Sequence, residues 1–389
     1  MSVLQRYLPV LHDRVRPRRF DSLFLFVTSR CNSLCRTCFY FDKLNSRDDL
    51  TLAEIDRISA TAPPFHKLWI SGGEPFMRNE LAEILILFAR RNRVHNINLP
   101  TNGLLPDKTF SVLEKVLAAC PEVQIDLNFS LDGLADTHDV IRGVPNNFVR
   151  TLQTLREVEK RYGSIGRLRR NVVSVITSEN YHELVALGQY LRENGDLDGQ
   201  YFEVVRGEIP DPKLKALTSE SLAKLHKRLM PVHRHYAKKL FAHWRTPARQ
   251  FATMYYLGNV RFHFDLHERC FEHPDPWPMP CTAGETSIVI DHNCAFRACE
   301  LRKTLASLRE FDFDVQAALS SEVMRTEVAA IPGDKCWCTH SCFIHDSSRF
   351  KPTVQFLNIP WAYLKQRWRQ LPDVSISDIE QLKASGPEL

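Results

Sequence analysis

The 389-residue sequence lacks any long hydrophobic run. Its longest apolar stretches, such as Leu23–Val27 and Ile84–Ala89, are far shorter than the roughly 20 residues that a membrane-spanning helix needs. Residues 1–20 carry several arginines but no continuous apolar core, so a secretory signal is not expected. We therefore expect a cytoplasmic protein in a compartment that keeps thiols reduced.

The sequence also lacks a large excess of either basic or acidic residues. The sequence has 51 Lys and Arg against 46 Asp and Glu, which gives a net charge of +5. This excess is too small to indicate nucleic-acid binding, and no nucleic-acid partner is expected. The absence of repeats and low-complexity tracts excludes a fibrous or mainly disordered chain. The length suggests two domains, or one large α/β domain with a smaller satellite.

Cysteine, in contrast, is abundant and clustered. Of the 11 cysteines, three lie between Cys31 and Cys38 and seven between Cys270 and Cys342. In a reducing compartment such clusters usually bind metal or take part in catalysis, because disulfides do not persist there. Cys120 stands alone after a helical run and is expected to be a small buried side chain.

Strand-like and helix-like segments alternate from Ser22 to Val205. Short segments rich in β-branched or aromatic residues predict six strands, at Leu23–Val27, Leu68–Ile70, Asn96–Leu99, Gln124–Ser130, Asn171–Thr177 and Gln200–Val205. Amphipathic segments between them predict helices at Leu52–Ala60, Asn79–Arg91, Asp107–Ala119, Asn147–Arg161 and Tyr181–Glu193. Six parallel βα units are fewer than a closed barrel needs. The expected fold class is α/β, a partial (β/α)6 TIM-like barrel with its chemistry at the carboxyl ends of the strands.

The remaining sequence predicts further parts around this barrel. The expected division is a basic N-terminal extension (1–20), the barrel (21–206), a linker and basic helical segment (207–269), a small cysteine-rich domain (270–350) and a helical tail (351–389). Pro231 is expected to kink or divide the helix predicted over Ser219–Trp244. In the tail, Trp361, Leu364 and Trp368 form a stripe among basic residues. We expect this stripe to pack on the body, and a membrane-surface helix is the less favoured alternative.

The first cysteine group follows the first predicted strand. Cys31, Cys35 and Cys38 are separated by three and then two residues. Three thiolates at this spacing can hold three corners of one iron–sulfur cluster and leave one iron with an open coordination position. Thiolates also suit zinc, but a zinc site would need a fourth cysteine or histidine nearby.

Further motifs follow the next three strands. They read Ser71-Gly72-Gly73-Glu74-Pro75, Thr101-Asn102-Gly103 and Ser130-Leu131-Asp132-Gly133. Together with the C-x3-C-x2-C loop, they resemble the radical S-adenosylmethionine (SAM) superfamily over about residues 20–205. The resemblance implies that Cys31, Cys35 and Cys38 are the catalytic ligands of a 4Fe–4S cluster, and that SAM completes the coordination of its open iron.

The resemblance also implies a set of SAM contacts. The predicted cofactor-binding residues are Phe39, Gly72, Gly73, Glu74, Pro75, Thr101, Asn102, Ser130 and Arg142. Gly72 and Gly73 would let the backbone approach the SAM ammonium group. Arg142, expected in a turn, would neutralise the SAM carboxylate, with a surface arginine as the alternative. Many relatives have an aromatic residue before the third cysteine, where this sequence has Thr37; Phe39 or Tyr40 would take its place.

The second cysteine group resembles the auxiliary-cluster extension of the same superfamily, called SPASM in its two-cluster form and Twitch in its one-cluster form. The resemblance implies one auxiliary 4Fe–4S cluster, with four ligands among Cys281, Cys299, Cys336, Cys338 and Cys342. Cys294 stands where the family usually has a turn glycine and is interpreted as a turn residue. The role of Cys270 is left open. A structural zinc site is the alternative for this group.

The implied function is that of a radical SAM oxidoreductase or modifying enzyme. A reductant such as flavodoxin or ferredoxin would supply the electron that cleaves SAM to a 5′-deoxyadenosyl radical, which abstracts hydrogen from a substrate. The substrate class is open: a peptide in maturation, or a small metabolite or lipid in dehydrogenation or modification. The short segments before Cys31 and after Cys342 are expected to exclude a leader-binding or cobalamin domain. The alternative is a non-catalytic binding or scaffold protein stabilised by zinc or iron–sulfur.

Overall fold

The computed structural model describes residues 20–368. Its strands are β1 (Ser22–Phe26), β2 (Lys67–Ser71), β3 (Asn96–Thr101), β4 (Gln124–Ser130), β5 (Leu168–Ile176), β6 (Gly199–Val204), β7 (Ser287–Ile290), β8 (Ala295–Arg297) and β9 (Ala306–Ser307). Its α-helices are α2 (Leu52–Thr61), α3 (Leu81–Arg91), α4 (Pro106–Ala119), α5 (Ala135–Arg142), α6 (Asn147–Tyr162), α7 (Leu184–Asn194), α8 (Ser219–Leu240), α9 (Thr246–Cys270), α10 (Val315–Leu319), α11 (Glu322–Gly333), α12 (Ser341–Arg349) and α13 (Ile359–Trp368). Single turns of 3-10 helix are η1 (Phe41–Lys43), η2 (Pro75–Met77), η3 (Pro212–Lys215) and η4 (Leu308–Phe311), and a π-helix, η5 (Val354–Asn358), precedes α13.

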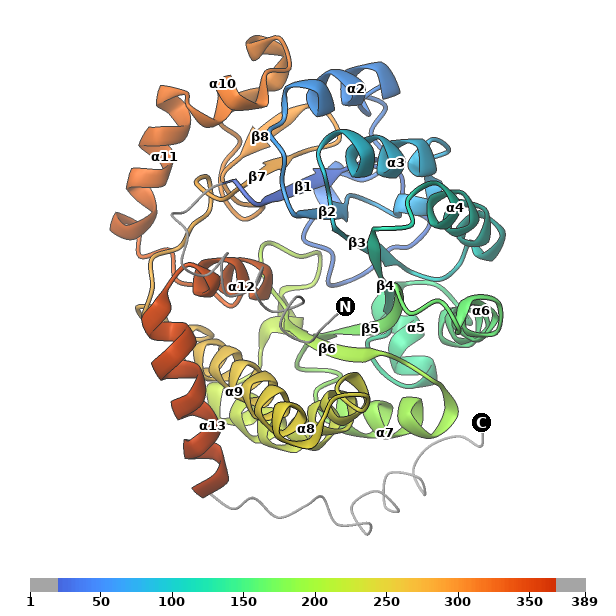
Figure 1. The fold of residues 1–389 in the computed structure, drawn as a ribbon, viewed down its shortest axis with the longest axis vertical. Coiled ribbons are helices and arrows are strands. Elements are labelled where there is room, and N and C mark those ends of the chain that lie inside the picture. The colour runs from blue at the N-terminus through green and yellow to red at the C-terminus, as the bar shows by residue number, and fades with distance from the viewer. Residues whose placement is uncertain (1–19, 369–389) are drawn as a thin grey trace.

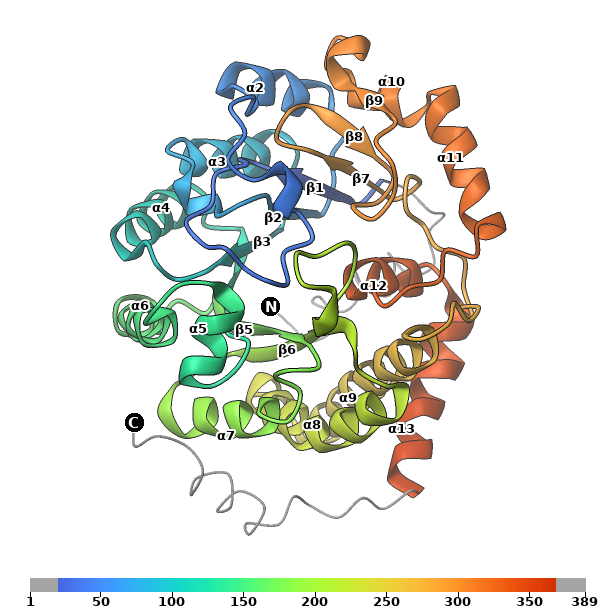
Figure 2. The same ribbon diagram turned by 180° about the vertical axis from the view of Figure 1, so that it is seen from behind.

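All nine strands belong to one open sheet. The strand order is β6-β5-β4-β3-β2-β1-β7-β8-β9, with β1 to β7 parallel and β8 and β9 antiparallel. The sheet curves so that α3, α4 and α6 lie on its outside, while α9 and α12 lie across its open side (Figures 1 and 2). The predicted fold class, an α/β partial barrel, is confirmed.

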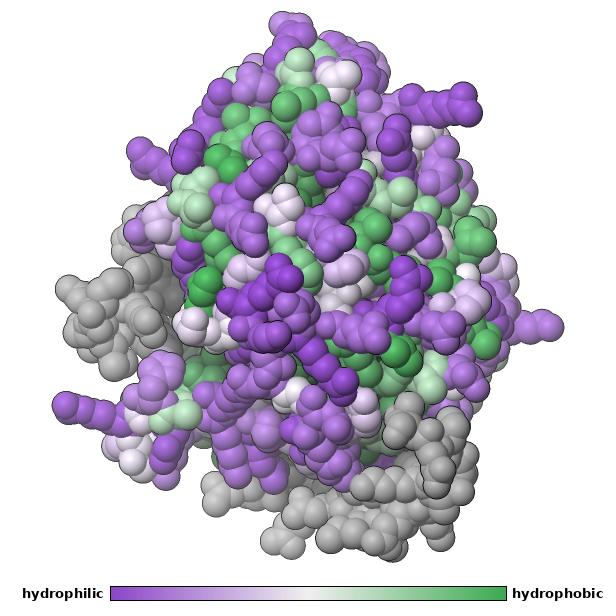
Figure 3. All heavy atoms as spheres, turned by 90° about the vertical axis from the view of Figure 1, so that its right-hand side faces the viewer, coloured by the Kyte–Doolittle hydropathy of each residue, from purple (hydrophilic) through white to green (hydrophobic). Residues whose placement is uncertain are grey.

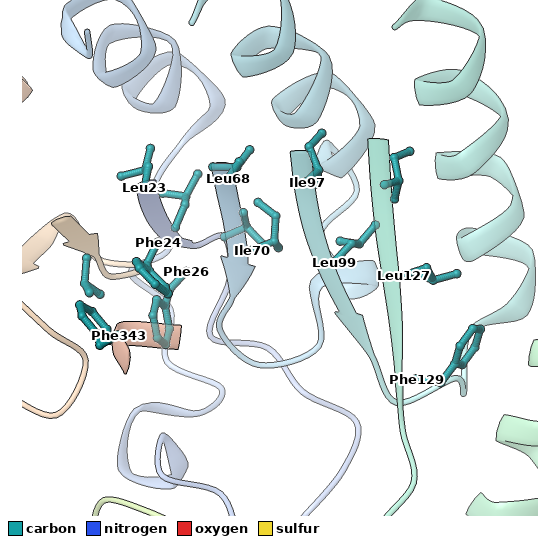
Figure 4. Packing of buried hydrophobic residues seen from close by; sticks show 14 of the residues in the cluster. Leu23, Phe24, Phe26, Leu68, Ile70, Ile97, Leu99, Leu127, Phe129 and Phe343 are labelled. Atoms are coloured by element: carbon teal, nitrogen blue, oxygen red, sulfur yellow. The ribbon is translucent and has the colours of Figure 1, made fainter. Parts of the chain in front are cut away.

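The two faces of the sheet differ in polarity because side chains alternate along each strand. Leu23, Leu68 and Ile97 are paired in register, fully buried, and form an apolar row beneath the helices (Figure 4). On the opposite, inner face, Phe24 stacks on Phe343 of α12 at 5.0 Å between ring centroids. On the outer surface around α4 and α6, hydrophobic residues are interspersed among hydrophilic ones (Figure 3).

The C-terminal half is joined to the barrel through the sheet itself. Residues Ser22–Leu25 of β1 pair with Ser287–Ile290 of β7, so the first strand of the barrel lies inside the sheet. This pairing was not expected from the sequence. The predicted division into five parts stays a prediction, and the basic N-terminal extension lies outside the described residues except for Phe20.

The structure changes three points about the helices. Pro231 does not divide α8, which runs unbroken from Ser219 to Leu240, so of the two expected outcomes only a kink stays a prediction. A second long helix, α9, follows where no helix was predicted, with Pro247 in its first turn. Arg142 ends helix α5 and does not lie in a turn; Gly143 terminates the helix with a left-handed φ of 65°. In the part of the chain that the structure describes, none of the helices combines the length and apolarity needed to cross a membrane.

Candidate active site

The first cysteine group lies on a loop at the carboxyl end of β1. The backbone of this loop is fixed by α5, since the Leu34 N–H donates to the Arg142 carbonyl at 3.2 Å and the Arg36 N–H to that of Ile141 at 2.9 Å. At its start, the Cys31 N–H donates to Oδ1 of Asn45 at 3.0 Å. The structure therefore brings the three predicted cysteines together on one anchored loop.

The three thiols influence one another. The pKa of Cys31 is raised to about 12 and that of Cys38 to about 11. Burial is the main cause, and the neighbouring Cys35 thiolate contributes to both. Burial also raises the pKa of Cys35, against the opposing charge of Arg142. Thiolates in this position need a compensating positive charge, which a bound metal cluster supplies as it displaces the protons. The donor set therefore fits an iron–sulfur cluster.

Arg142 is a buried residue beside these cysteines. Its side chain is 12% exposed, its Nε lies 2.6 Å from Oδ2 of Asp132, and its Nη1 lies 3.7 Å from Sγ of Cys35. This burial rules out the alternative of a surface arginine. Asp132, which the sequence showed within the Ser130–Gly133 motif, is fully buried and holds the guanidinium in place.

Gly72 and Gly73 pack against the start of the cysteine loop. A Cβ on Gly72 would lie 2.2 Å from the carbonyl oxygen of Thr28, and one on Gly73 would lie 2.1 Å from that of Arg30. Gly72 also has a φ of 122°, which favours glycine. The Gly73 N–H donates to Thr28 at 2.8 Å. The lack of side chains therefore has a reason in the protein itself, whatever the glycines contact in a cofactor.

Glu74 links three strand ends. It is 2% exposed and accepts hydrogen bonds from the Asn102 N–H at 2.7 Å and the Thr101 hydroxyl at 3.1 Å. Burial raises the pKa of Glu74 to about 7 despite these bonds. Asn102 in turn donates to Asn32 at 2.7 Å, within the cysteine loop. Pro75 is buried at the start of η2. The structure gives Glu74, Thr101 and Asn102 a scaffolding role beside the cysteines.

Phe39 and Tyr40 differ in surroundings. Tyr40 is buried, and its hydroxyl lies 2.5 Å from Nδ1 of His292. Phe39 is half-buried beneath the guanidinium of Arg206, 5.2 Å from the ring centroid. Of the two, Phe39 is thus the aromatic side chain left for an adenine contact. Ser130, also half-buried, ends β4 as predicted.

The second cysteine group is assembled from two segments. The β7–β8 hairpin brings Cys281 and Cys299 together, and Cys336 and Cys338 arrive from the loop after α11. The pKa of Cys281 is raised to about 11 and that of Cys338 to about 12. Burial is the main cause, and Cys336 contributes to both. Burial also raises the pKa of Cys299, with contributions from Cys338 and Cys281. Within residues 20–368, no three His, Cys, Asp or Glu side chains converge closely enough for a single metal ion.

Cys342 differs from these four cysteines in the charges that act on it. Burial raises its pKa, and the charges with the largest effect on that pKa belong to Glu203, Arg206 and Glu300. These charges form a buried ion network: Oε1 of Glu300 lies 2.9 Å from Nη2 of Arg206 and 2.8 Å from Nε2 of His340. Burial alone would raise the pKa of Glu300, but His340 and Arg206 hold it at about 2. His340 is thus directed to Glu300.

Cys294 and Cys270 have other partners. Cys294 occupies the turn between β7 and β8 with a left-handed φ of 75°, the conformation for which glycine is preferred. It is buried near Ser307 and Arg309. The Cys270 thiol donates to the Asp275 carbonyl at 3.2 Å. Cys120 is buried at the end of α4, as expected.

The inner face of the sheet continues from these sites and is polar. Trp69 Nε1, Asn171 Oδ1 and Glu203 Oε2 are buried without a hydrogen-bond partner among the described residues. Tyr201 belongs to the same face: burial raises its pKa to about 12, and 37% of the residue remains accessible to solvent.

Sequence reasoning missed Arg206 and Glu300, and it considered His340 only as a residue that would slightly favour zinc in the second group. Each had a weak signal: Arg206 follows the last predicted strand, Glu300 follows Cys299, and His340 lies between Cys338 and Cys342. Their adjacency could not be read from these positions, because it requires β7 to pair with β1.

The fold and this site define a partial-barrel protein with a three-cysteine loop at the carboxyl end of its first strand. Residues 25–190 match the model of the radical SAM superfamily. This match gives residues 25–190 a radical SAM domain, the domain of enzymes that use a 4Fe–4S cluster and SAM. The cysteine-rich C-terminal region lies beyond the matched residues.

Curated relatives match only part of the chain. A probable GTP 3′,8-cyclase of Methanothermobacter thermautotrophicus is 29% identical over 185 residues, which cover 45% of this chain and 54% of that protein. A probable GTP 3′,8-cyclase of Methanococcus aeolicus is 34% identical over 126 residues, which cover 30% of this chain and 39% of that protein. The chain thus spans about half the length, or less, of these relatives.

Solved structures share the fold over most of the chain. SuiB of Streptococcus suis bound to S-adenosylmethionine has a TM-score of 0.54 at 17% identity, over 83% of this chain and 71% of SuiB. The anSMEcpe protein with bound AdoMet and a Cp18Cys peptide has a TM-score of 0.57 at 17% identity, over 90% of this chain and 95% of that one.

Proposed function

We propose that the protein is a radical SAM oxidoreductase or modifying enzyme that acts on a polar substrate at the inner face of the barrel. The observation that carries this proposal is the anchored three-cysteine loop within a radical SAM domain, at the carboxyl end of a sheet whose inner face is polar. A cluster and SAM bound there would supply one-electron cleavage of a carbon–sulfur bond and, through it, hydrogen abstraction. A low-potential donor of the flavodoxin or ferredoxin kind would supply the electron.

The residues around the cysteine loop would have different roles in binding the cluster and SAM. Cys31, Cys35 and Cys38 would bind three irons. Gly72 to Pro75, Thr101 and Asn102 support the loop and border the SAM site, where Ser130 and Phe39 supply a hydroxyl and an aromatic ring. Arg142 keeps a positive charge beside Cys35, which lowers the cost of placing a charged cluster in a buried position.

The polarity of the inner face supports the substrate class. Buried polar atoms are normally hydrogen-bonded, so Trp69 Nε1 and Asn171 Oδ1 call for partners, whereas Glu203 Oε2 already lies 3.7 Å from Nη1 of Arg206. A small polar metabolite or a peptide offers such groups, whereas a lipid acyl chain would leave them unsatisfied. The substrate named for the GTP 3′,8-cyclases is not transferred, because those proteins are matched over about half their length or less.

For the second group, we propose one auxiliary 4Fe–4S cluster held by Cys281, Cys299, Cys336 and Cys338. The mutual influence of their thiols supports this set. Cys342 would be left to the ion network of Arg206, Glu300 and His340. This network and Phe39 lie between the two cysteine groups, so the auxiliary cluster would border the substrate region.

The decisive experiment is cofactor cleavage by the reconstituted protein. After anaerobic reconstitution with iron and sulfide, incubation with SAM and a reductant should yield 5′-deoxyadenosine. We expect Cys35→Ala to abolish this product while the protein still folds, because the cluster loses one of three ligands. Cys120→Ala is the matched control and should retain cleavage, because Cys120 is a buried cysteine at the end of α4, outside both cysteine groups. Undiminished cleavage by Cys35→Ala would sink the assignment.

Metal analysis separates the auxiliary cluster from the zinc-stabilised scaffold alternative. Two 4Fe–4S clusters predict about eight irons per chain after reconstitution. A value near four irons, accompanied by stoichiometric zinc, would instead favour structural zinc in the second group, while about zero iron in both groups would favour the non-catalytic scaffold.

A further inference from the structure

Positive charge is concentrated in two segments. Residues 221–264 hold nine Lys or Arg and no Asp or Glu, and residues 347–372 hold five and none. Since the whole chain has a net charge of +5, the rest of it carries −9. The described parts of these segments pack together, because α9 contacts both α8 and α13. The molecule is therefore strongly asymmetric in charge.

The same region exposes large apolar side chains. Phe356, Leu357, Trp361 and Leu364 are exposed by 54, 64, 57 and 39%. Phe251 of α9, exposed by 64%, stacks near Tyr255, whose hydroxyl bonds to Gln355 of the π-helix. We call Phe251, Phe356, Leu357, Trp361 and Leu364 the apolar ridge. Single exposed hydrophobic residues are common, but five in adjoining elements indicate an interaction surface.

The apolar ridge is not the buried side of α13. Ile359 and Ala362 are the buried residues of this helix, and Gly258 of α9 leaves room for the Ile359 carbonyl. Trp361 and Leu364 each keep a large part of their side chain accessible to solvent, so the predicted stripe is only partly covered. Trp368, the third residue of the predicted stripe, has a side chain outside the described set. Figure 1 shows α13 along the outer side of the molecule.

Basic residues flank the apolar ridge. Arg245 and Arg249 adjoin Phe251 in sequence, and Lys351 and Lys365 stand at either end of the π-helix and α13. Within residues 20–368, no carboxylate lies within ion-pair distance of these four cations. Three other cations of the region are paired: Lys239 with Asp196, Arg261 with Asp265, and Arg349 with Asp21.

We propose that this face docks on an anionic membrane surface. Aromatic and aliphatic side chains rimmed by Lys and Arg, with no acidic residue between them, are the composition of a helix that lies in the lipid headgroup region. The absence of acidic residues over both segments supplies the charge complementarity. The docking is peripheral: the apolar ridge enters the interface while the barrel stays outside the bilayer.

Vesicle flotation with the full chain tests this proposal. The protein should float with phosphatidylcholine vesicles that contain roughly a third phosphatidylglycerol, remain unbound to pure phosphatidylcholine, and dissociate as salt is raised. The variant Phe356→Ser/Trp361→Ser should bind at least roughly tenfold more weakly, because two aromatic anchors are lost. Arg245→Gln/Arg249→Gln should weaken binding and reduce its dependence on salt.

Val149→Ser, an exposed apolar residue on α6, is the matched control and should bind like the unaltered protein. Circular dichroism confirms that each variant is folded. Absence of flotation, equal binding to neutral vesicles, or unchanged binding by both double variants overturns the proposal. Binding of nucleic acid in preference to vesicles, or a dimer in solution that Phe356→Ser/Trp361→Ser abolishes, also overturns it. Cofactor cleavage does not enter the readout, so this test is independent of the proposed enzymatic function.

Discussion

Gly73 is the residue with the least freedom to vary in the candidate site. Its missing Cβ would fall 2.1 Å from the carbonyl oxygen of Arg30, and the neighbouring N–H of Glu74 donates to the same carbonyl at 2.8 Å. We expect Gly73→Ala to lower the free energy of unfolding by about 1–3 kcal/mol through overpacking, and to shift the cysteine loop. Thermal unfolding and iron content after reconstitution measure the two effects.

Gly166→Ala is the matched control for this substitution. Gly166 has no atom within 4 Å of its ideal Cβ position, so its replacement should change the stability by less than about 0.5 kcal/mol. Equal stability of the two variants would mean that the close approach of Gly73 to Arg30 is not a constraint in solution.

Cys294 and Cys299 are both buried but differ in their surroundings. Cys294 lies in the turn near Arg309, whereas Cys299 lies among other cysteines. Cys294→Ser should therefore leave the iron content of the reconstituted protein unchanged, while Cys299→Ser should lower it by about four irons, one cluster. Iron lost equally from both variants would contradict the assignment of Cys294 to the turn.

At the scale of elements, α8 and α9 bury histidines between them. His226, His233 and His267 are each at most 3% exposed, and burial lowers the pKa of all three. His233 lies between Phe202 and Phe264, at 5.7 and 5.5 Å from their rings, and neither of its nitrogens has a hydrogen-bond partner among the described residues. The helix pair therefore holds neutral imidazoles in an apolar contact.

This contact predicts that the protein loses stability in mild acid. Folded His233 has a pKa of about 3, whereas the ordinary value is 6.5, so below pH 6.5 the unfolded chain takes up a proton that the folded chain does not. The contribution of His233 to the free energy of unfolding should fall by about 2 kcal/mol between pH 7 and pH 5. His233→Phe should reduce this slope in urea denaturation. His235→Gln, on the exposed side of α8, should keep it, and an unchanged slope in His233→Phe would refute the argument.

The elements that the sequence predicted are those with one clear periodicity. β4 was predicted at its observed bounds, and α2 to α4 within two residues, because each shows a single buried side or an alternating strand. Helix α9 was missed because it contacts α8 on one side and α13 on another, so its apolar residues do not form one stripe. The partners of a strand are set by tertiary contacts, so β7 beside β1 could not be read from local pattern.

In the candidate site, too, some features were predictable from local sequence and others were not. The cysteine loop and the Gly72–Pro75 turn were predictable because each is a contiguous motif that follows a strand. The burial of Arg142 against Asp132 and the placement of Cys342 beside the charges of Glu203, Arg206 and Glu300 depend on how distant segments fold together. A sequence specifies such contacts only through the whole fold.

At the scale of the whole molecule, the pairing of β1 with β7 sets the order in which the chain can be completed. A ribosome that has released residues 1–206 has made β1 to β6, but β1 then has only β2 beside it, and its second partner, β7, is encoded some eighty residues later. During that interval the backbone N–H and C=O groups of Ser22–Leu25 form an open edge that other chains can pair with. Heterologous production should therefore favour the full chain over the isolated barrel, and chaperone dependence should be greatest for nascent chains that end before β7.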